Sequence, residues 1–392
     1  MKITIETKAF KSAVKKLSNI ATKGTLPILG DILFRSNTDS TVSMTAYDCE
    51  TRHSIELPFA CDDFSPFQFT LNCDKLIKLS SVMSSKDIKI YFDAITPNRV
   101  EIDFGTKVKL DSHNPEDFPS VCWNDMQVEG SLMLGFGCLQ DAISHTMWSV
   151  AKSNEWSYAI CGVCLDIDKQ AGKVTAVGTD AKKMAVYTLT GSVCNIVAQS
   201  DYSDMAIVPL KACNQIAGFD GTCNVAISRK YVMVTGGGEC IITKKIDKPY
   251  PKYKRVIPDN FDYTVMMDTE ELCKDAKQII KVGKTLGWVK EKPHVMFTFE
   301  NDLVISHSSQ PSTDIIEFEH VAKAEIYESD VPDGWQIKFD ISFVEEILKS
   351  SDSECVMSFN EHQYDDNGKI TSTPAMFKFT DNYFVILQPV QM

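Results

Sequence analysis

The sequence has no apolar run near the roughly 20 residues that a membrane-spanning helix needs. Its first residues, MKITIETKAFKS, alternate polar and apolar side chains and lack the apolar core of a signal peptide. These two absences predict a protein of the cytoplasm that does not enter a membrane. The composition, 44% hydrophobic and 24% charged, is typical of a folded globular chain.

Motifs of a catalytic or metal-binding site are also missing. The histidines are isolated, without HxxxH or HExxH spacing, and no GxSxG motif occurs. Cys161 and Cys164 form a CxxC pair, but they lie in an alternating run, Tyr158–Ile167, that predicts a strand. Residues three apart on a strand point to opposite faces, so this pair should not share a metal. We therefore predict that the protein is not an enzyme and binds neither metal nor cofactor.

The chain has thirteen cysteines, which is a high count. Their number is odd, they are scattered, and most lie inside apolar runs, where a reduced cysteine behaves as a small hydrophobic residue. This pattern favours buried free thiols over a disulfide framework.

Three segments of the chain share one order of predicted elements. An amphipathic stretch recurs near Lys8, Leu139 and Glu270, which are 131 residues apart each time, and Asp48 precedes Asp180 by 132. A period this long indicates a repeated domain, because the units of a solenoid are only about 20 to 50 residues long. We predict three domains, residues 1–124, 125–256 and 257–392.

Each repeat is rich in strands and carries two short helices. The predicted strands alternate polar and apolar residues, as in Asp87–Phe92, Tyr231–Thr235 and Met376–Thr380, and Leu26–Phe34 is a further strand-like run. Helices are expected at Lys8–Ala21, Cys73–Val82, Leu139–Val150, Pro209–Gly218, Glu270–Gly283 and Ile341–Lys349. The elements do not alternate as βαβα, so we predict an α+β class with antiparallel sheets that carry helices on one face.

Lysines recur on one face of two of these helices, although the net charge of the chain is −13. A solvated surface is the ordinary interpretation of one lysine-rich helix. Its recurrence in two repeats favours phosphate binding that is independent of base sequence and dependent on salt. The lysines are Lys8, Lys11 and Lys15 in the first repeat, and Lys274, Lys277 and Lys281 in the third.

Several short motifs stand in an order and spacing that are specific when taken together. They are Thr25–Gly30, Asp117–Pro119, Thr179-Asp180 with Met184–Val186, Ile207–Pro209 and Tyr250–Pro258. In these motifs, and over essentially its whole length, the chain resembles the bacterial sliding clamp family, the beta subunit of DNA polymerase III.

The resemblance implies a head-to-tail homodimer that closes a ring of six similar domains around duplex DNA. Helices would line the hole and sheets would form the rim. The function implied is that of a processivity factor, with the replicative polymerase, the clamp loader and other proteins that carry clamp-binding peptides as partners. An alternative stays open, a clamp-like protein that binds peptides and sequesters replication partners without loading on DNA.

The resemblance also implies a peptide pocket between the second and third domains. Apolar walls would hold a Leu or Phe side chain, and lysine or arginine at the mouth would pair with polar or acidic groups. The family usually has Gly-His-Arg where this chain has Ala181-Lys182-Lys183, and Met-Pro-Met-Arg where it has Gln388–Gln391. These departures indicate a divergent member, from a phage or an atypical bacterium, with an altered peptide preference. The predicted pocket residues are Ile160, Thr179, Ala181, Lys182, Lys183, Met184, Pro251, Arg255, Val256, Ile386, Gln388, Pro389 and Val390.

Two further sets of residues complete the predicted sites. The DNA contacts carried over from the family are Lys23, Asn154, Tyr158 and Lys211, beside the helix lysines. The dimer contact would place Val108 and Leu110, on an edge strand, against a helix of the third domain near Ile279 and Val282. A core position is the alternative for these four apolar residues. Asp180 recurs at the position of Asp48, so we expect a structural turn there and not a catalytic carboxylate.

Overall fold

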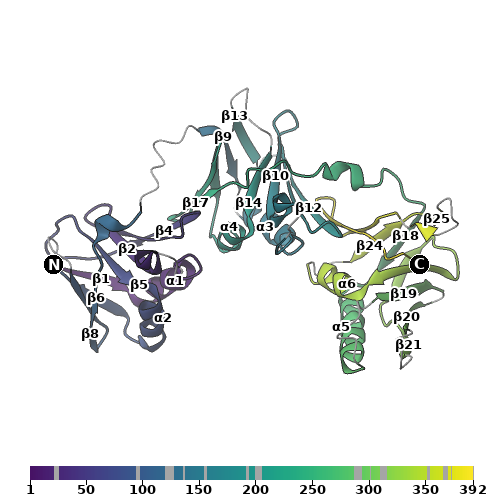
Figure 1. The fold of residues 1–392 in the computed structure, drawn as a ribbon, viewed down its shortest axis with the longest axis horizontal. Helices are drawn as coiled ribbons and strands as arrows, with labels where there is room; N and C mark the ends of the chain where they lie inside the picture. Colours follow the sequence, from purple (N-terminus) through teal and green to yellow (C-terminus); the bar gives the residue numbers. More distant parts are fainter. Residues whose placement is uncertain are drawn as a thin grey trace. The chain divides into compact units, whose positions relative to one another are not determined.

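The computed structural model describes the chain in two compact units (Figure 1). Unit 1 comprises Met1–Asp141, Ile167–Lys173 and Thr190–Asp247, and unit 2 comprises Ala142–Asp166, Val174–Leu189 and Lys248–Met392. The described residues are all except 22–25, 94–97, 120–127, 136, 154–156, 191–193, 199–204, 287–293, 301, 310–315, 351–353, 365–369, 372 and 392.

The helices reproduce the predicted repeat. The first helix of each repeat begins at residue 7, 138 or 269, a constant spacing of 131, in α1 (Thr7–Leu17), α3 (Cys138–Met147) and α5 (Thr269–Thr285). The second helices are α2 (Cys73–Val82), α4 (Leu210–Ile216) and α6 (Ile341–Leu348). Helices α1 and α2 pack together in unit 1, and α5 and α6 pack together in unit 2 (Figure 1). The prediction of two helices in each repeat is confirmed.

Unit 1 contains two sheets among its described residues. The four-stranded sheet runs in the order β1 (Lys2–Glu6), β6 (Asp87–Tyr91), β7 (Arg99–Asp103) and β8 (Lys107–Asp111). The larger sheet runs β13 (Cys194–Ala198), β9 (Val128–Leu134), β15 (Cys223–Ser228), β16 (Tyr231–Gly236), β17 (Glu239–Lys244), β4 (Thr51–Pro58), β3 (Thr41–Tyr47), β2 (Asp31–Ser36) and β5 (Gln68–Asn72). Strand β14 (Met205–Pro209) also belongs to this unit.

Unit 2 repeats this construction. Its four-stranded sheet runs β21 (Ile316–Val321), β20 (Leu303–Ser309), β19 (His294–Phe299) and β23 (Trp335–Asp340). Its larger sheet runs β10 (Gly162–Asp168), β11 (Lys173–Thr179), β12 (Lys183–Leu189), β28 (Tyr383–Leu387), β27 (Ala375–Lys378), β24 (Cys355–Phe359), β18 (Tyr263–Met267) and β22 (Ile326–Ser329). A short pair is formed by β25 (Gln363–Tyr364) and β26 (Ile370–Thr371).

Antiparallel pairing joins neighbouring repeats inside each unit. In unit 1, β17 of the second repeat pairs with β4 of the first, with Ile241 opposite His53. In unit 2, β12 of the second repeat pairs with β28 of the third, with Met184 opposite Ile386. The predicted α+β class with antiparallel sheets is therefore confirmed. The domain boundaries stay a prediction, and residue 124 lies outside the described residues.

Each unit has its own apolar core, built from the inward faces of the sheets and helices. In unit 1, Phe10 of α1 stacks on Phe34, which stacks on Phe69 at a centroid distance of 4.8 Å. In unit 2, Phe297 and Phe339 are buried beside helices α5 and α6. Rigid aromatic rings contribute large buried areas, so these cores hold the helices against the sheets.

Three strands of the structure are shorter than the residue ranges predicted from the sequence. The run Leu26–Phe34 begins with a 3₁₀ turn, Pro27–Gly30, because Pro27 has a fixed φ and no amide hydrogen, and β2 begins only at Asp31. The run Tyr158–Ile167 likewise begins with a 3₁₀ turn, Tyr158–Cys161. Strand β27 ends at Lys378, before the predicted end at Thr380.

The 3₁₀ turn at Tyr158–Cys161 shows that the predicted strand geometry of the CxxC pair was wrong. Cys161 ends the 3₁₀ turn and Cys164 lies in β10, so the two residues are not three apart on one strand. Both are free thiols, and burial raises the pKa of Cys164. Within the described residues, no group of three or more histidine, cysteine or carboxylate side chains could hold a metal.

The other described cysteines are free as well, as the scattered pattern predicted. Six cysteines are buried, and burial raises the pKa of one of them, Cys73, to about 12. Four are partly buried, and Cys49 is the one described cysteine that is exposed. Among the described residues, no helix is long and apolar enough to cross a membrane.

Candidate functional site

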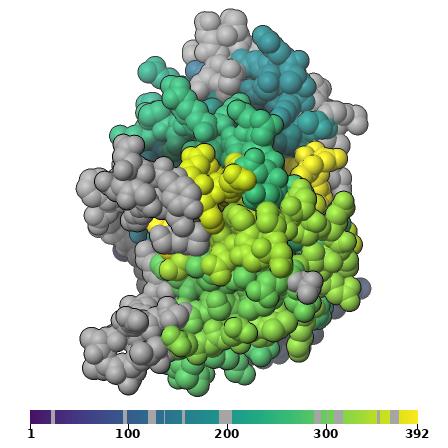
Figure 2. Space-filling view, turned by 90° about the vertical axis from the view of Figure 1, so that its right-hand side faces the viewer, coloured from purple at the N-terminus to yellow at the C-terminus, as the bar shows by residue number. Residues whose placement is uncertain are grey.

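A cavity of about 400 Å³ in unit 2 brings together five segments of the chain. They are the 3₁₀ turn at Tyr158–Cys161, the Asp180–Lys183 turn, the segment around Pro251, Pro374 before β27, and the end of β28. Atoms of the C-terminal residues, in yellow, reach the surface beside the yellow-green third repeat in Figure 2. Ten predicted residues line this pocket: Ile160, Thr179, Ala181, Lys182, Lys183, Met184, Pro251, Val256, Ile386 and Gln388.

Three predicted residues, Arg255, Pro389 and Val390, flank the lining without belonging to it. Four lining residues were not predicted, Ser157, Lys252, Tyr253 and Pro374. Two of these, Lys252 and Tyr253, lie inside the Tyr250–Pro258 motif, so the motif itself was the signal. Pro374 lies in the segment before β27 and has no comparable signal in the sequence.

The wall formed by Tyr250–Val256 is held by two tyrosine hydroxyls. Tyr250 donates to the backbone carbonyl of Val177 at 3.1 Å, and Tyr253 donates to Asp166 Oδ2 at 2.6 Å. Lys254 also pairs with Asp166 at 2.9 Å. Burial raises the pKa of both tyrosines, and the hydrogen bond to Asp166 raises that of Tyr253 further. The two phenols therefore stay neutral and fix this wall against β10 and β11.

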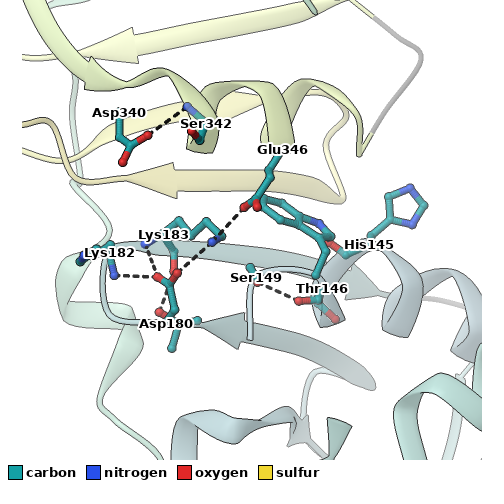
Figure 3. Close-up of polar contacts among 11 residues, drawn as sticks. His145, Thr146, Ser149, Asp180, Lys182, Lys183, Asp340, Ser342 and Glu346 are labelled. Atoms are coloured by element: carbon teal, nitrogen blue, oxygen red, sulfur yellow. Dashed lines mark hydrogen bonds and ion pairs between the residues drawn. The ribbon is translucent and has the colours of Figure 1, made fainter. Parts of the chain in front are cut away.

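Asp180 organises the turn at the pocket rim, as Figure 3 shows. Its Oδ1 accepts the backbone amides of Lys182 and Lys183, both at 2.9 Å. Asp48 makes the same turn in the first repeat, where its Oδ1 accepts the amides of Glu50 and Thr51. The structural role predicted for Asp180 from this recurrence is confirmed.

The two lysines of this turn have different environments. Lys182 is exposed, whereas the Lys183 side chain is only 7% exposed. The Lys183 ammonium lies 2.8 Å from Asp180 Oδ2 and 3.0 Å from Glu346 Oε2 (Figure 3). Both lysines line the pocket, but the ammonium of Lys183 is already paired inside unit 2.

The lysines predicted to contact DNA also divide into open and paired groups. Lys8 and Lys15 are exposed on α1, and Lys277 and Lys281 are exposed on α5. Lys274 is paired with Glu270 at 2.8 Å and with Glu271 at 2.6 Å, so its charge is largely balanced. The side chain of Lys11 donates to the Met83 carbonyl.

The residues predicted to contact DNA from the family resemblance differ in their exposure and pairing. Tyr158 is exposed, and Lys211 pairs with Asp48. Lys23 and Asn154 lie outside the described residues.

The four residues predicted at the dimer contact are only partly accessible. Leu110 and Ile279 are buried in the cores of units 1 and 2, which is the alternative that the sequence left open. Val108 is half-buried and Val282 is exposed. Strand β8, which carries Val108 and Leu110, lies at one edge of its sheet, in agreement with the predicted edge position.

The fold is that of the bacterial sliding clamps, as two solved structures show. The structure matches that of the Pseudomonas aeruginosa sliding clamp bound to griselimycin, with a TM-score of 0.81, 18% identity and all of both chains covered. It also matches the Helicobacter pylori beta clamp bound to a DNA ligase peptide, with a TM-score of 0.80, 16% identity and all of both chains covered.

The sequence comparisons agree with the fold. Residues 1–122 match the family described as the N-terminal domain of the DNA polymerase III beta subunit. The beta sliding clamp of Treponema pallidum is 26% identical over 361 residues, 89% of this chain and 90% of that protein. The predicted resemblance to the bacterial sliding clamps is therefore confirmed, at low sequence identity.

Proposed function

We propose that this protein is a DNA sliding clamp, a non-catalytic processivity factor that encircles duplex DNA as a homodimeric ring. The pocket would tether the replicative polymerase, the clamp loader and other partners through short peptides. The observation that carries the proposal is the assembly of ten predicted pocket residues around one cavity.

The chemistry of the cavity supports a peptide as its ligand. Its volume, about 400 Å³, lies within the range of roughly 300–1,000 Å³ that is usual for small-ligand pockets. Ile160, Met184 and Ile386 provide apolar walls, and Lys182 and Lys252 add positive charge. No carboxylate is among the described lining residues, so an acidic group beside an apolar anchor would suit the pocket. The relative from Helicobacter pylori is bound to a DNA ligase peptide.

Two edge strands support head-to-tail dimerisation. β8 and β21 each lie at one edge of the four-stranded sheets in units 1 and 2. β8 exposes Lys107 and Lys109, which share the single carboxylate of Glu101 at 3.4 and 3.5 Å, and β21 exposes Glu317 and Glu319. An edge strand presents unpaired backbone groups that a second chain can extend. Because the charges are complementary, β8 of one protomer would pair with β21 of another, and two such contacts would close a ring.

The exposed lysines on α1 and α5 support the contact with DNA. Flexible ammonium groups attract phosphates without reading base edges, so binding would be independent of sequence. A chain with a net charge of −13 needs little direct affinity for DNA if a closed ring holds it there.

Peptide titration tests the observation that carries the proposal. The probe is a fluorescent peptide that contains adjacent Leu and Phe residues, and the control is the same peptide with both replaced by Ser. We expect saturable binding of the first peptide only, measured by anisotropy. Equal binding of the two peptides would contradict the pocket.

Sedimentation tests the ring contact. Lys107→Glu with Lys109→Glu should weaken the dimer at least roughly tenfold, since like charges would face one another across the edges. Adding Glu317→Lys with Glu319→Lys should restore the dimer. The control, Lys75→Glu with Lys78→Glu, makes the same charge change on α2 and should leave the dimer intact. A wild-type protein that is monomeric at micromolar concentration would contradict the homodimer.

A further inference from the structure

Two neighbouring lysines at the pocket rim differ in what their ammonium groups contact. Both follow Asp180, and both donate their backbone amides to its carboxylate. Their side chains, however, lie in separate surroundings: Lys182 is exposed and Lys183 is buried. The position of each ammonium determines whether Lys182 or Lys183 can contact a bound peptide.

The ammonium of Lys183 is enclosed within unit 2. Besides its pairs with Asp180 and Glu346, it lies 4.3 Å from the ring centroid of Phe343 and 5.9 Å from that of Trp148. A cation over an aromatic face is attracted by the ring electrons. Two carboxylates and two rings thus surround one ammonium, and this contact ties the Asp180–Lys183 turn to α6, as Figure 3 shows for Glu346.

Lys182 is held by its backbone instead of its side chain. Its carbonyl accepts the amide of Gln388 at 2.9 Å, which fixes the turn beside the end of β28. Its ammonium lies farther from Phe343, at 5.9 Å, and the side chain is exposed. The backbone of Lys182 is therefore fixed while its charge remains accessible at the pocket.

We propose that these adjacent lysines divide two tasks: Lys183 positions the pocket rim from within, and Lys182 selects for acidic groups on the bound peptide. The inference rests on the proposed binding of peptides at this pocket. Without the Lys183 ammonium, Asp180 and Glu346 would lose the cation that they share, and the turn would lose its tie to α6.

The division of tasks predicts different responses to peptide charge. Loss of Lys183 should weaken every peptide equally, because the rim itself is displaced. Loss of Lys182 should weaken only peptides that carry an acidic residue near the apolar anchor. Removal of Glu346 should act like removal of Lys183, because both break the same tie.

The experiment uses the full-length protein and two synthetic peptides, one with Asp before a Leu-Phe pair and one with Asn at that position. The variants are Lys183→Met, which keeps the aliphatic stem, Lys183→Arg, Glu346→Gln and Lys182→Met. Anisotropy gives the affinities, and hydrogen exchange reports the backbone amides of residues 181–184. Hydrogen exchange is measured on the free protein because the substitution of a residue that only contacts the peptide would leave the exchange rates of these amides unchanged.

We expect Lys183→Met and Glu346→Gln to weaken both peptides by a similar factor, roughly threefold to tenfold, and to speed amide exchange in the turn. Lys183→Arg should restore both properties, because arginine keeps the positive charge. Lys182→Met should weaken only the Asp peptide and leave the exchange unchanged.

The proposal is overturned if Lys183→Met weakens only the Asp peptide, or if neither it nor Glu346→Gln speeds exchange in the turn. A wild-type protein that binds neither peptide would contradict the proposed function instead. In that case the exchange measurements still decide whether Lys183 holds the turn.

Discussion

The turns at residues 48–51 and 180–183 have the same backbone and different surroundings. In each, an aspartate accepts two amides, and the residue after it has a positive φ, 74° at Cys49 and 73° at Ala181. Each turn leads into a strand that pairs with another repeat, β4 with β17 and β12 with β28.

The second oxygen of each aspartate marks the difference. Asp48 Oδ2 pairs with Lys211 of α4, and Thr51 bonds Thr243 through a buried pair of hydroxyls. Asp180 Oδ2 pairs with Lys183, within the same turn. The comparison shows that the turn is a structural element that the first and second repeats share. What the second repeat adds is the set of neighbours that form a pocket.

The two repeat junctions also bury charges of opposite sign. Where β17 meets β4, Glu239 is buried and bonds His53 at 2.9 Å and also Lys16. Where β12 meets β28, the buried charge is the ammonium of Lys183. A buried charge requires partners, so each junction depends on residues from distant parts of the sequence.

The largest effect is expected from a charge placed in the pocket wall. Val256→Asp should lower peptide affinity by roughly tenfold to a hundredfold, because the pocket then presents a carboxylate to an apolar anchor. Val256 is 50% exposed, so the fold should tolerate the change. Val82→Asp, at a valine of α2 that is 63% exposed, is the matched control and should leave the affinity unchanged.

Removing either aspartate should separate the structural role of the turn from its binding role. Asp48→Ala and Asp180→Ala should each lower stability by about 1–3 kcal/mol, because backbone amides lose their acceptor. Only Asp180→Ala should also weaken peptide binding. Thermal unfolding and peptide anisotropy measure the two effects, and equal peptide affinities in both variants would contradict the distinction.

The buried carboxylate in unit 1 should make that unit sensitive to acid. Burial alone would raise the pKa of Glu239, but hydrogen bonds from His53 and Lys16 outweigh it and hold the pKa below its ordinary value of 4.5. Ionised Glu239 therefore stabilises the folded protein above pH 4.5. This stabilisation is lost as the pH falls through the lower pKa that Glu239 has in the folded protein.

Melting temperatures at neutral and acidic pH check this expectation. Glu239→Gln should be less stable than wild type at neutral pH, and the difference should narrow below pH 4.5. Glu116→Gln, at an exposed carboxylate of unit 1, serves as the control. A difference that stays constant with pH would contradict the assignment.

The smallest expected effect concerns the positive φ that both turns share. Ala181→Gly and Cys49→Gly should each stabilise the protein by about 0.5–1 kcal/mol, because glycine adopts this conformation without a Cβ clash. Melting temperatures should rise in both variants. A decrease at either position would argue against backbone strain there.

The elements that depend on local or repeated patterns were predictable from the sequence. The constant spacing of α1, α3 and α5 and the role of Asp180 followed from the internal repeat. The environments of single side chains did not follow. The burial of Lys183 depends on Glu346, and Pro374 reaches the pocket only because β27 pairs with β28. Pairings between residues so distant in sequence leave no local signal.

Retention on circular DNA tests most directly whether the protein encircles the duplex. The protein would be loaded on nicked circular duplex with a bacterial clamp loader and ATP, and bound protein separated by gel filtration. We predict that it co-elutes with the circle and is lost when the DNA is linearised. Equal retention on circular and linear DNA would contradict a sliding ring. A dimer that binds peptides but is retained on neither DNA would instead be a clamp-like protein that does not load on DNA.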